Sequence, residues 1–192
     1  MYLYKIASIK GQKIDSLIQY VSKDRIDKAM RMRHDEDKLR SLLVEKVLND
    51  LLLESNLITG SPVELEYDKY GKPSVKNIED IYISLSHAGE YVACMVADAP
   101  CGIDIEKTDR NYKNILKRVF TKEELEAGDN DEFYATLWTL KEAVVKAIGT
   151  GITQDFREFA VLGSECEVKG VKYKIETLEA PLNYAMSFAI KG

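Results

Sequence analysis

The sequence predicts an α+β fold, and three observations support this prediction. Two long stretches, residues 35–54 and 131–148, repeat apolar side chains at the three-and-four spacing of a helix that buries one face. Several short stretches rich in Val, Ile and Tyr are typical of strands. Hydrophobic residues make up 45% of the 192-residue chain and charged residues 31%, a composition typical of a folded globular protein.

The first half of the chain has the order strand, helices, strands. Ser22 is placed to cap a helix over residues 23–33, ahead of the longer helix at 35–54. Gly60 and the residues after it end the helical pattern. Strands are predicted at residues 2–9, 63–67, 81–86 and 91–98, with a turn at 68–73.

The second half, after Ala99 and Pro100, repeats that order. Thr121 and Glu124 have the spacing of a capping box that opens a short helix, and the helix at 131–148 stops at Gly149. The other predicted elements are a helix at 111–119 and strands at 101–106, 158–162, 171–178 and 184–190. Two similar lobes, 1–100 and 101–192, and a single α+β domain both fit this element order.

Composition and motifs exclude several classes of function. The net charge of −5 argues against a nucleic-acid binder, which usually has a basic excess. The longest apolar run, residues 91–97, is too short to span a bilayer, and the N-terminus does not resemble a secretory signal. Three cysteines without a CxxC pair predict free thiols and a cytoplasmic location. Phosphate-loop, dinucleotide-binding, zincin and nucleophile-elbow motifs are absent.

The stretch CGIDIEK at residues 101–107 is the first candidate for chemistry. In a strand, Asp104 and Glu106 point to one face, and two carboxylates there repel each other unless a cation or proton lies between them. Oxygen ligands suit Mg²⁺, which proteins often hold with one or two carboxylates plus substrate phosphates. A solvated strand face with two acids explains the same alternation.

The helix predicted over residues 131–148 carries three charged residues of interest. Lys141 falls inside the apolar stripe, where a lysine either extends to the surface or pairs with an anion. Glu142 and Lys146 lie four apart on the neighbouring face, and a routine helical ion pair accounts for these two alone.

Two turns offer donors for an anion. In YGKP, Gly71 and Pro73 favour a tight turn that presents Lys72 to solvent or to a ligand. In SLSHAGEY, Ser86 and His87 close a predicted strand, where both are able to donate hydrogen bonds to one phosphate. A solvated lysine and a structural histidine fit these patterns equally.

The order and spacing of the motifs are together specific. The succession YGKP, ISLSHAGEYV, CGIDIEK, RVFTKEEL and WTLKEAVVKAIGTGI, from residue 70 to 152, resembles the motif series of the 4′-phosphopantetheinyl transferases of the surfactin-synthetase type. The resemblance implies two similar α+β lobes related by a pseudo-twofold axis, with coenzyme A between them. It also implies transfer of phosphopantetheine from coenzyme A to a serine of an apo acyl or peptidyl carrier protein.

The resemblance assigns roles to individual residues. Asp104, Glu106 and Glu142 match magnesium-binding acids of the family. Glu142 and Lys146 are the expected catalytic residues, with Glu142 taking the proton of the carrier serine directly or through a water and Lys146 stabilising phosphate charge. The residues that match coenzyme A contacts are Arg25, Lys28, Lys72, Ser86, His87, Asp104, Lys141 and Lys146.

The partners expected from this resemblance are coenzyme A and an apo carrier protein, and one chain is expected to act as a monomer. Because such carriers are usually acidic, a basic segment with one apolar anchor is the expected docking surface, or else a solvated helix face. Its residues are Lys113, Lys117, Arg118 and Lys122, with Phe120 as the anchor. The competing interpretations are a magnesium-dependent phosphate-ester hydrolase and an inactive module that binds coenzyme A or a carrier protein.

Overall fold

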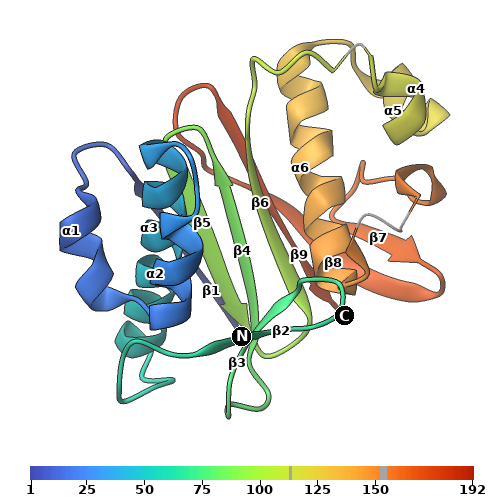
Figure 1. Ribbon diagram of the computed structural model, residues 1–192. Helices are drawn as coiled ribbons and strands as arrows, with labels where there is room; N and C mark the ends of the chain where they lie inside the picture. The colour runs from blue at the N-terminus through green and yellow to red at the C-terminus, as the bar shows by residue number, and fades with distance from the viewer. Residues whose placement is uncertain (113, 152–154) are drawn as a thin grey trace.

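Two antiparallel sheets stand side by side at the centre of the computed structural model, which describes residues 1–112, 114–151 and 155–192 (Figure 1). The first sheet has the order β1-β5-β4 and the second the order β6-β9-β8-β7. Their strands are β1 (Tyr2–Ser8), β4 (Tyr82–Ala88), β5 (Tyr91–Ala97), β6 (Cys101–Lys107), β7 (Glu165–Val168), β8 (Val171–Leu178) and β9 (Tyr184–Lys191). A separate hairpin pairs β2 (Leu65–Tyr67) with β3 (Pro73–Val75). The α+β prediction is confirmed.

One long helix covers each sheet (Figure 1). Helix α3 (Asp35–Glu54) packs on β1, β4 and β5, and α6 (Asp131–Ile148) packs on β6 and β9. The short helices are α1 (Ile14–Leu17), α2 (Lys23–Met30), α4 (Leu116–Val119) and α5 (Lys122–Ala127), with 3₁₀ turns η1 (Ile18–Tyr20) and η3 (Phe156–Glu158). Among the helices of the described ranges, none has the length and hydropathy that a membrane span needs.

The predicted helix ends are formed by the residues that the sequence suggested. The Ser22 hydroxyl accepts a hydrogen bond from the Arg25 amide at the start of α2. Thr121 and Glu124 form the full capping box of α5. Gly149 ends α6 with φ of 82°, a left-handed conformation that glycine adopts readily.

The two sheets share a buried apolar cluster. Ala88 and Met95 contribute from the first sheet, and Ile103, Ile105 and Phe188 contribute from the second. Two further clusters lie under the long helices, one between α3 and the first sheet and one between α6 and the second. The first sheet is therefore packed on both faces, by α3 on one and by residues of the second sheet on the other.

The strand predicted at residues 158–162 is wrong. This stretch follows the 3₁₀ turn η3, and the chain enters a strand only at Glu165. Its backbone groups bond to two buried side chains instead of a neighbouring strand: the Phe159 carbonyl accepts from Lys141, and the Val161 amide donates to Glu124. The helix predicted at 111–119 is also shorter than expected, since in the described part of that stretch α4 begins at Leu116.

Candidate functional site

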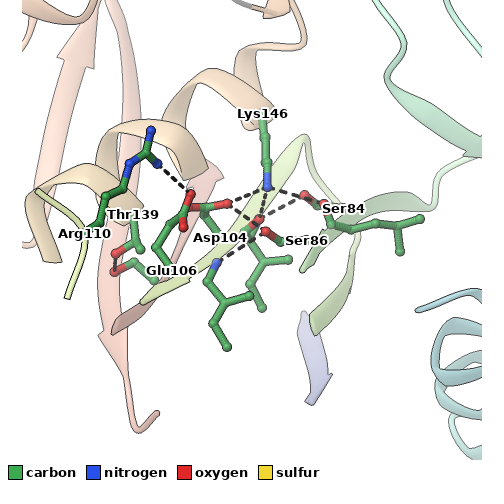
Figure 2. A network of polar contacts seen from close by, with 11 residues as sticks. Ser84, Ser86, Asp104, Glu106, Arg110, Thr139 and Lys146 are labelled. Atoms are coloured by element: carbon green, nitrogen blue, oxygen red, sulfur yellow. Dashed lines mark hydrogen bonds and ion pairs between the residues drawn. The ribbon is translucent and has the colours of Figure 1, made fainter. Parts of the chain in front are cut away.

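The site lies where β4 of the first sheet meets β6 of the second. The Ser84 hydroxyl accepts a hydrogen bond from the Ile103 amide at 3.0 Å, and the Ser86 hydroxyl accepts one from the Ile105 amide at 3.4 Å (Figure 2). Both serines lie on one face of β4, because strand side chains two residues apart point the same way. These side-chain hydroxyls thus join the two sheets, and they fix the position of Asp104 on β6 relative to β4.

Asp104 is the centre of the polar network in Figure 2. Its side chain is buried, and its Oδ1 accepts hydrogen bonds from Ser86 Oγ and Lys146 Nζ, both at 2.7 Å. Lys146 Nζ also donates to the Ile103 carbonyl at 3.0 Å. The other carboxylate oxygen, Oδ2, is buried and has no hydrogen-bond partner. Because an unpartnered buried oxygen is costly, Oδ2 is the atom where a cation or a ligand proton fits.

Glu106 and Glu142 surround Asp104 with further negative charge. Burial, and then the Asp104 carboxylate, raise the pKa of Glu106, while Arg110 Nη1 donates to Glu106 Oε1 at 3.1 Å. The same two causes raise the pKa of Glu142 to about 7. A group of carboxylates whose charges raise the pKa of Glu106 and Glu142 in this way attracts a cation.

The chemistry of these donors fits Mg²⁺, which prefers carboxylate oxygens and substrate phosphates. The spacing of the acids does not by itself complete a site, since within residues 1–112, 114–151 and 155–192 no group of three or more His, Cys, Asp or Glu side chains is arranged to hold a metal ion. The magnesium site formed by Asp104, Glu106 and Glu142 therefore stays a prediction.

A pocket of about 250 Å³ opens beside this network and brings the two halves of the chain together. Tyr70 and Lys72 line it from the first half, and Glu142, Lys146 and Phe156 line it from the second. Lys72 Nζ donates to the carbonyls of Lys146 at 2.8 Å and of Ala147 at 3.1 Å, at the negative end of the α6 dipole. Burial lowers the pKa of Lys72.

His87 does not share the position of Ser86. Strand β4 continues to Ala88, so the two neighbours point to opposite faces. Ser86 pairs with Ala93 on the face toward the second sheet, whereas His87 pairs with Val92, which packs under α3. Burial, followed by the positive charges of Arg40 and Lys146, lowers the pKa of His87.

Arg25 and Lys28 line a separate hollow of about 300 Å³ together with Tyr67. Arg25 is buried, and its guanidinium donates to Glu45 Oε2 and to the Tyr67 hydroxyl, both at 2.7 Å. Lys28 Nζ lies 5.4 Å from the centroid of the Tyr67 ring. The hairpin of β2 and β3 connects this hollow to the first pocket, since Tyr67 ends β2 and Lys72 lies in the turn just before β3.

The prediction that Lys141 contacts coenzyme A is wrong. Its side chain is 0% exposed, and its ammonium group donates to Glu124 Oε2 at 3.0 Å and to the carbonyls of Phe156 and Phe159 at 2.7 and 2.6 Å. An ammonium group has three donors, and all three are used. The anion that explains a lysine in the apolar stripe is Glu124, inside the protein.

Sequence reasoning missed three residues of the site. Ser84 had a signal, because it stands two residues before Ser86 and shares its face. Arg110 follows Glu106 by four residues. This spacing does not predict an ion pair in a strand, and the pair forms because β6 ends at Lys107, between the two residues. Phe156 has no signal in the sequence, because it reaches the pocket from a short 3₁₀ turn, η3, that no sequence pattern predicted.

Comparisons with known proteins agree with this arrangement of motifs. A model of the 4′-phosphopantetheinyl transferase superfamily matches residues 100–189. The chain is 30% identical over 165 residues to 4′-phosphopantetheinyl transferase Sfp of Bacillus subtilis, covering 83% of this chain and 74% of the relative. It is 31% identical to 4′-phosphopantetheinyl transferase psf-1 of Bacillus pumilus, covering 80% and 69%.

Among solved structures, a holo-(acyl-carrier-protein) synthase from Thermotoga maritima matches with a TM-score of 0.38 and 20% identity, over 48% of this chain and 62% of the other. The two Bacillus relatives carry the assignment, because each is at least 30% identical to this chain over more than two thirds of its own length. The chain therefore belongs to the 4′-phosphopantetheinyl transferase superfamily.

Proposed function

We propose that this chain transfers 4′-phosphopantetheine from coenzyme A to a serine of an apo acyl or peptidyl carrier protein, with Mg²⁺ held by Asp104, Glu106 and Glu142. The observation that carries the proposal is the pocket where Lys72 and Lys146 meet beside the unpartnered Asp104 Oδ2. Two lysines suit the pyrophosphate of coenzyme A, and carboxylates next to them suit the cation that accompanies phosphates. The similarity to named transferases favours this phosphate chemistry over others.

We propose that residues 1–100 form one lobe and residues 101–192 the other, and that coenzyme A binds between them. Lys72 and Lys146 support this division, because they come from different lobes and line one pocket. Since one chain supplies both walls, we expect a monomer. The three cysteines are free and buried, which agrees with a reducing, cytoplasmic environment.

The proposed reaction forms one P–O bond and breaks another. The carrier serine oxygen attacks the phosphorus that bears pantetheine, the bond to the second phosphate breaks, and adenosine 3′,5′-bisphosphate leaves. Glu142 accepts the serine proton directly or through a water. Lys146 keeps its bond to Asp104 and exchanges its hydrogen bonds to the Leu85 and Ile103 carbonyls for the phosphate oxygens. When bound, Mg²⁺ supplies positive charge that offsets the negative charge growing on the leaving group.

Intact-protein mass spectrometry tests the proposal. An apo carrier protein incubated with this chain, coenzyme A and Mg²⁺ is expected to gain the mass of one phosphopantetheine, and a chelator is expected to prevent the gain. Coenzyme A cleaved without any gain on the carrier would favour a phosphate-ester hydrolase. Intact coenzyme A and unmodified acyl and peptidyl carriers would favour a binding module.

Removing the Ser86 hydroxyl is expected to slow the transfer. A Ser86→Ala variant loses a charge-assisted hydrogen bond to Asp104 Oδ1, so we expect kcat to fall roughly tenfold, equivalent to about 1.4 kcal/mol. Steady-state assays of carrier modification measure the change. Ser55→Ala is the control, since it removes a hydroxyl that donates only to backbone carbonyls of α3. Equal kcat values for both variants would contradict the role of Ser86.

Reversing two positive charges on α4 is expected to weaken carrier binding. Lys117 and Arg118 are exposed, whereas Phe120 is 2% exposed and stacks on Tyr134, so the prediction of Phe120 as an apolar anchor is wrong. Lys113 lies outside the described residues.

A Lys117→Glu/Arg118→Glu variant is expected to raise the KM for an acidic carrier about tenfold at low salt, with little effect on the KM for coenzyme A. The matched control reverses Lys10 and Lys13, two exposed lysines of the first half. If the two variants had the same KM for the carrier, Lys117 and Arg118 would not be part of the surface that binds the carrier.

A further inference from the structure

We propose that Lys141 is a positioning residue: with Glu124 it fixes the wall of the coenzyme A pocket that Phe156 forms. The inference rests on the proposed transferase function, because that function gives the pocket its ligand. Lys141 itself touches no ligand, since its side chain is completely buried. Lys141 therefore affects the reaction only indirectly, by positioning the residues to which it is hydrogen-bonded.

Lys141 and Glu124 form a buried junction between separate parts of the second half. Glu124 Oε2 accepts from Lys141 Nζ at 3.0 Å and from the Thr121 amide at 2.8 Å, and its Oε1 accepts from the Val161 amide at 2.9 Å. Lys141 Nζ donates in addition to the Phe156 carbonyl at 2.7 Å. The pair therefore ties the start of α5, the middle of α6 and the chain after Asp155 to one point.

The stretch from Phe156 to Val161 takes its position from this junction. A turn and an irregular segment, not a strand, form this stretch, so no sheet ladder fixes it. The Phe156 and Phe159 carbonyls and the Val161 amide all bond to the Lys141–Glu124 pair. Hydrogen bonds to charged, buried partners are directional, and they set where this backbone lies.

Phe156 links the Lys141–Glu124 junction to the wall of the pocket. Its side chain lines the pocket with Glu142 and Lys146, and its ring stacks on Trp138 with centroids 5.6 Å apart and an interplanar angle of 14°. The Arg110 guanidinium lies 4.8 Å from the centroid of the Trp138 ring. From Lys141 the contacts thus run through Phe156 and Trp138 to Arg110, which pairs with the predicted metal ligand Glu106.

Lys141 also controls the neighbouring residue on α6. Successive helical residues point about 100° apart, so anchoring Lys141 in the core turns Glu142 toward the pocket. A large apolar residue at this position would fill the space but would leave Glu124 and two carbonyls without their partner. The ion pair therefore supplies orientation that apolar packing alone does not supply.

A Lys141→Met variant tests the inference through two readouts. We expect the KM for coenzyme A to rise about tenfold or more while kcat changes less than about threefold. The pocket wall moves, but a buried methionine still turns Glu142 toward the pocket and the Asp104–Lys146 contact stays. The second readout is fluorescence. Trp138 is the only tryptophan of the chain, and displacement of Phe156 is expected to expose it and shift its emission to longer wavelength.

Leu48→Ala is the control for general loss of stability. Leu48 is fully buried in the separate cluster under α3, so its truncation lowers the melting temperature without touching the Lys141 junction. We expect this variant to keep the parent KM for coenzyme A and the parent Trp138 emission. A Lys141→Met enzyme that matches Leu48→Ala in both readouts would overturn the inference.

Two further variants keep the test decisive. Phe156→Leu removes the ring but keeps the carbonyl that Lys141 binds. It is expected to raise the KM for coenzyme A in a protein of nearly parental stability. An unchanged KM would show that the Phe156 ring does not shape the coenzyme A pocket. If Lys141→Met does not fold, Glu124→Gln replaces it, and parental Trp138 emission and KM in that variant would overturn the inference. Because the fluorescence needs no substrate, a parent chain that modifies no carrier refutes the transferase proposal and leaves the test of Lys141 intact.

Discussion

An Asp104→Asn enzyme is expected to lose about a thousandfold or more in kcat/KM for transfer to a carrier protein. Asp104 accepts from Ser86 and Lys146 with one oxygen, and its other oxygen is buried without a hydrogen-bond partner. The amide keeps the size of the side chain but removes the negative charge that orients Lys146 and attracts a cation. Loss of a group that interacts most strongly in the transition state typically costs roughly 10²–10³-fold, and Asp104 serves two such interactions.

The measurement is the rate of carrier modification by intact mass, over a range of Mg²⁺ concentrations. Ile105→Val serves as the control, because Ile105 lies on the same strand but points into the shared apolar cluster. It should keep the parental rate within about twofold. An Asp104→Asn enzyme that retains more than a tenth of the parental rate at every Mg²⁺ concentration would show that this carboxylate is not central to the reaction.

A Gly102→Ala variant is expected to be strongly destabilised, although the change adds one methyl group. A Cβ placed at Gly102 would lie 1.9 Å from the Ala143 carbonyl oxygen and 2.8 Å from the Ala147 amide nitrogen, both backbone atoms of α6. Neither atom is able to move without shifting the helix. We expect the free energy of unfolding to fall by about 3 kcal/mol or more, and the melting temperature by roughly 6–12 °C.

The same variant should also lose activity, because Glu142 and Lys146 are carried by α6, and Lys146 Cβ lies 2.8 Å from the added atom. Calorimetry measures the stability, and the carrier assay at a temperature where the variant is folded measures the rate. Gly60→Ala is the matched control, since a Cβ there meets nothing within 4 Å. If Gly102→Ala melted within about 2 °C of Gly60→Ala, the close approach of β6 and α6 would be disproved.

Much of this architecture was predictable because local patterns agreed with long-range packing. The periodic stripe of α6, the capping box at Thr121 and the stop at Gly149 act within a few residues, so the sequence shows them directly. Helix α3 was also predicted, but it is buried on more than one face, because it lies between the first sheet and helices α1 and α2. The shared face of Asp104 and Glu106 was likewise visible from the alternation of strand side chains. The family resemblance added the meaning of these acids, which spacing alone left open.

The failures occurred where distant residues decide the outcome. Residues 158–162 have strand-like composition, yet Lys141 and Glu124 satisfy their backbone groups, and no local signal announces that partner. For Lys141 the sequence left open an extended side chain or an anionic partner, and the partner is a buried glutamate, Glu124, far from it in the chain. Phe120 resembled a surface anchor by its basic neighbours, while its ring packs inside on Tyr134.

The apolar cluster between the two sheets has a consequence for cooperativity. Ala88 and Met95 of the first half pack with Ile103, Ile105 and Phe188 of the second, so separating the halves would expose a continuous apolar face on each. Burial of that face couples their stabilities, and neither half is expected to persist as a folded fragment. Unfolding of one half therefore destabilises the other half. As a result, partly unfolded states in which Lys72 and Lys146 have moved apart are rarely populated.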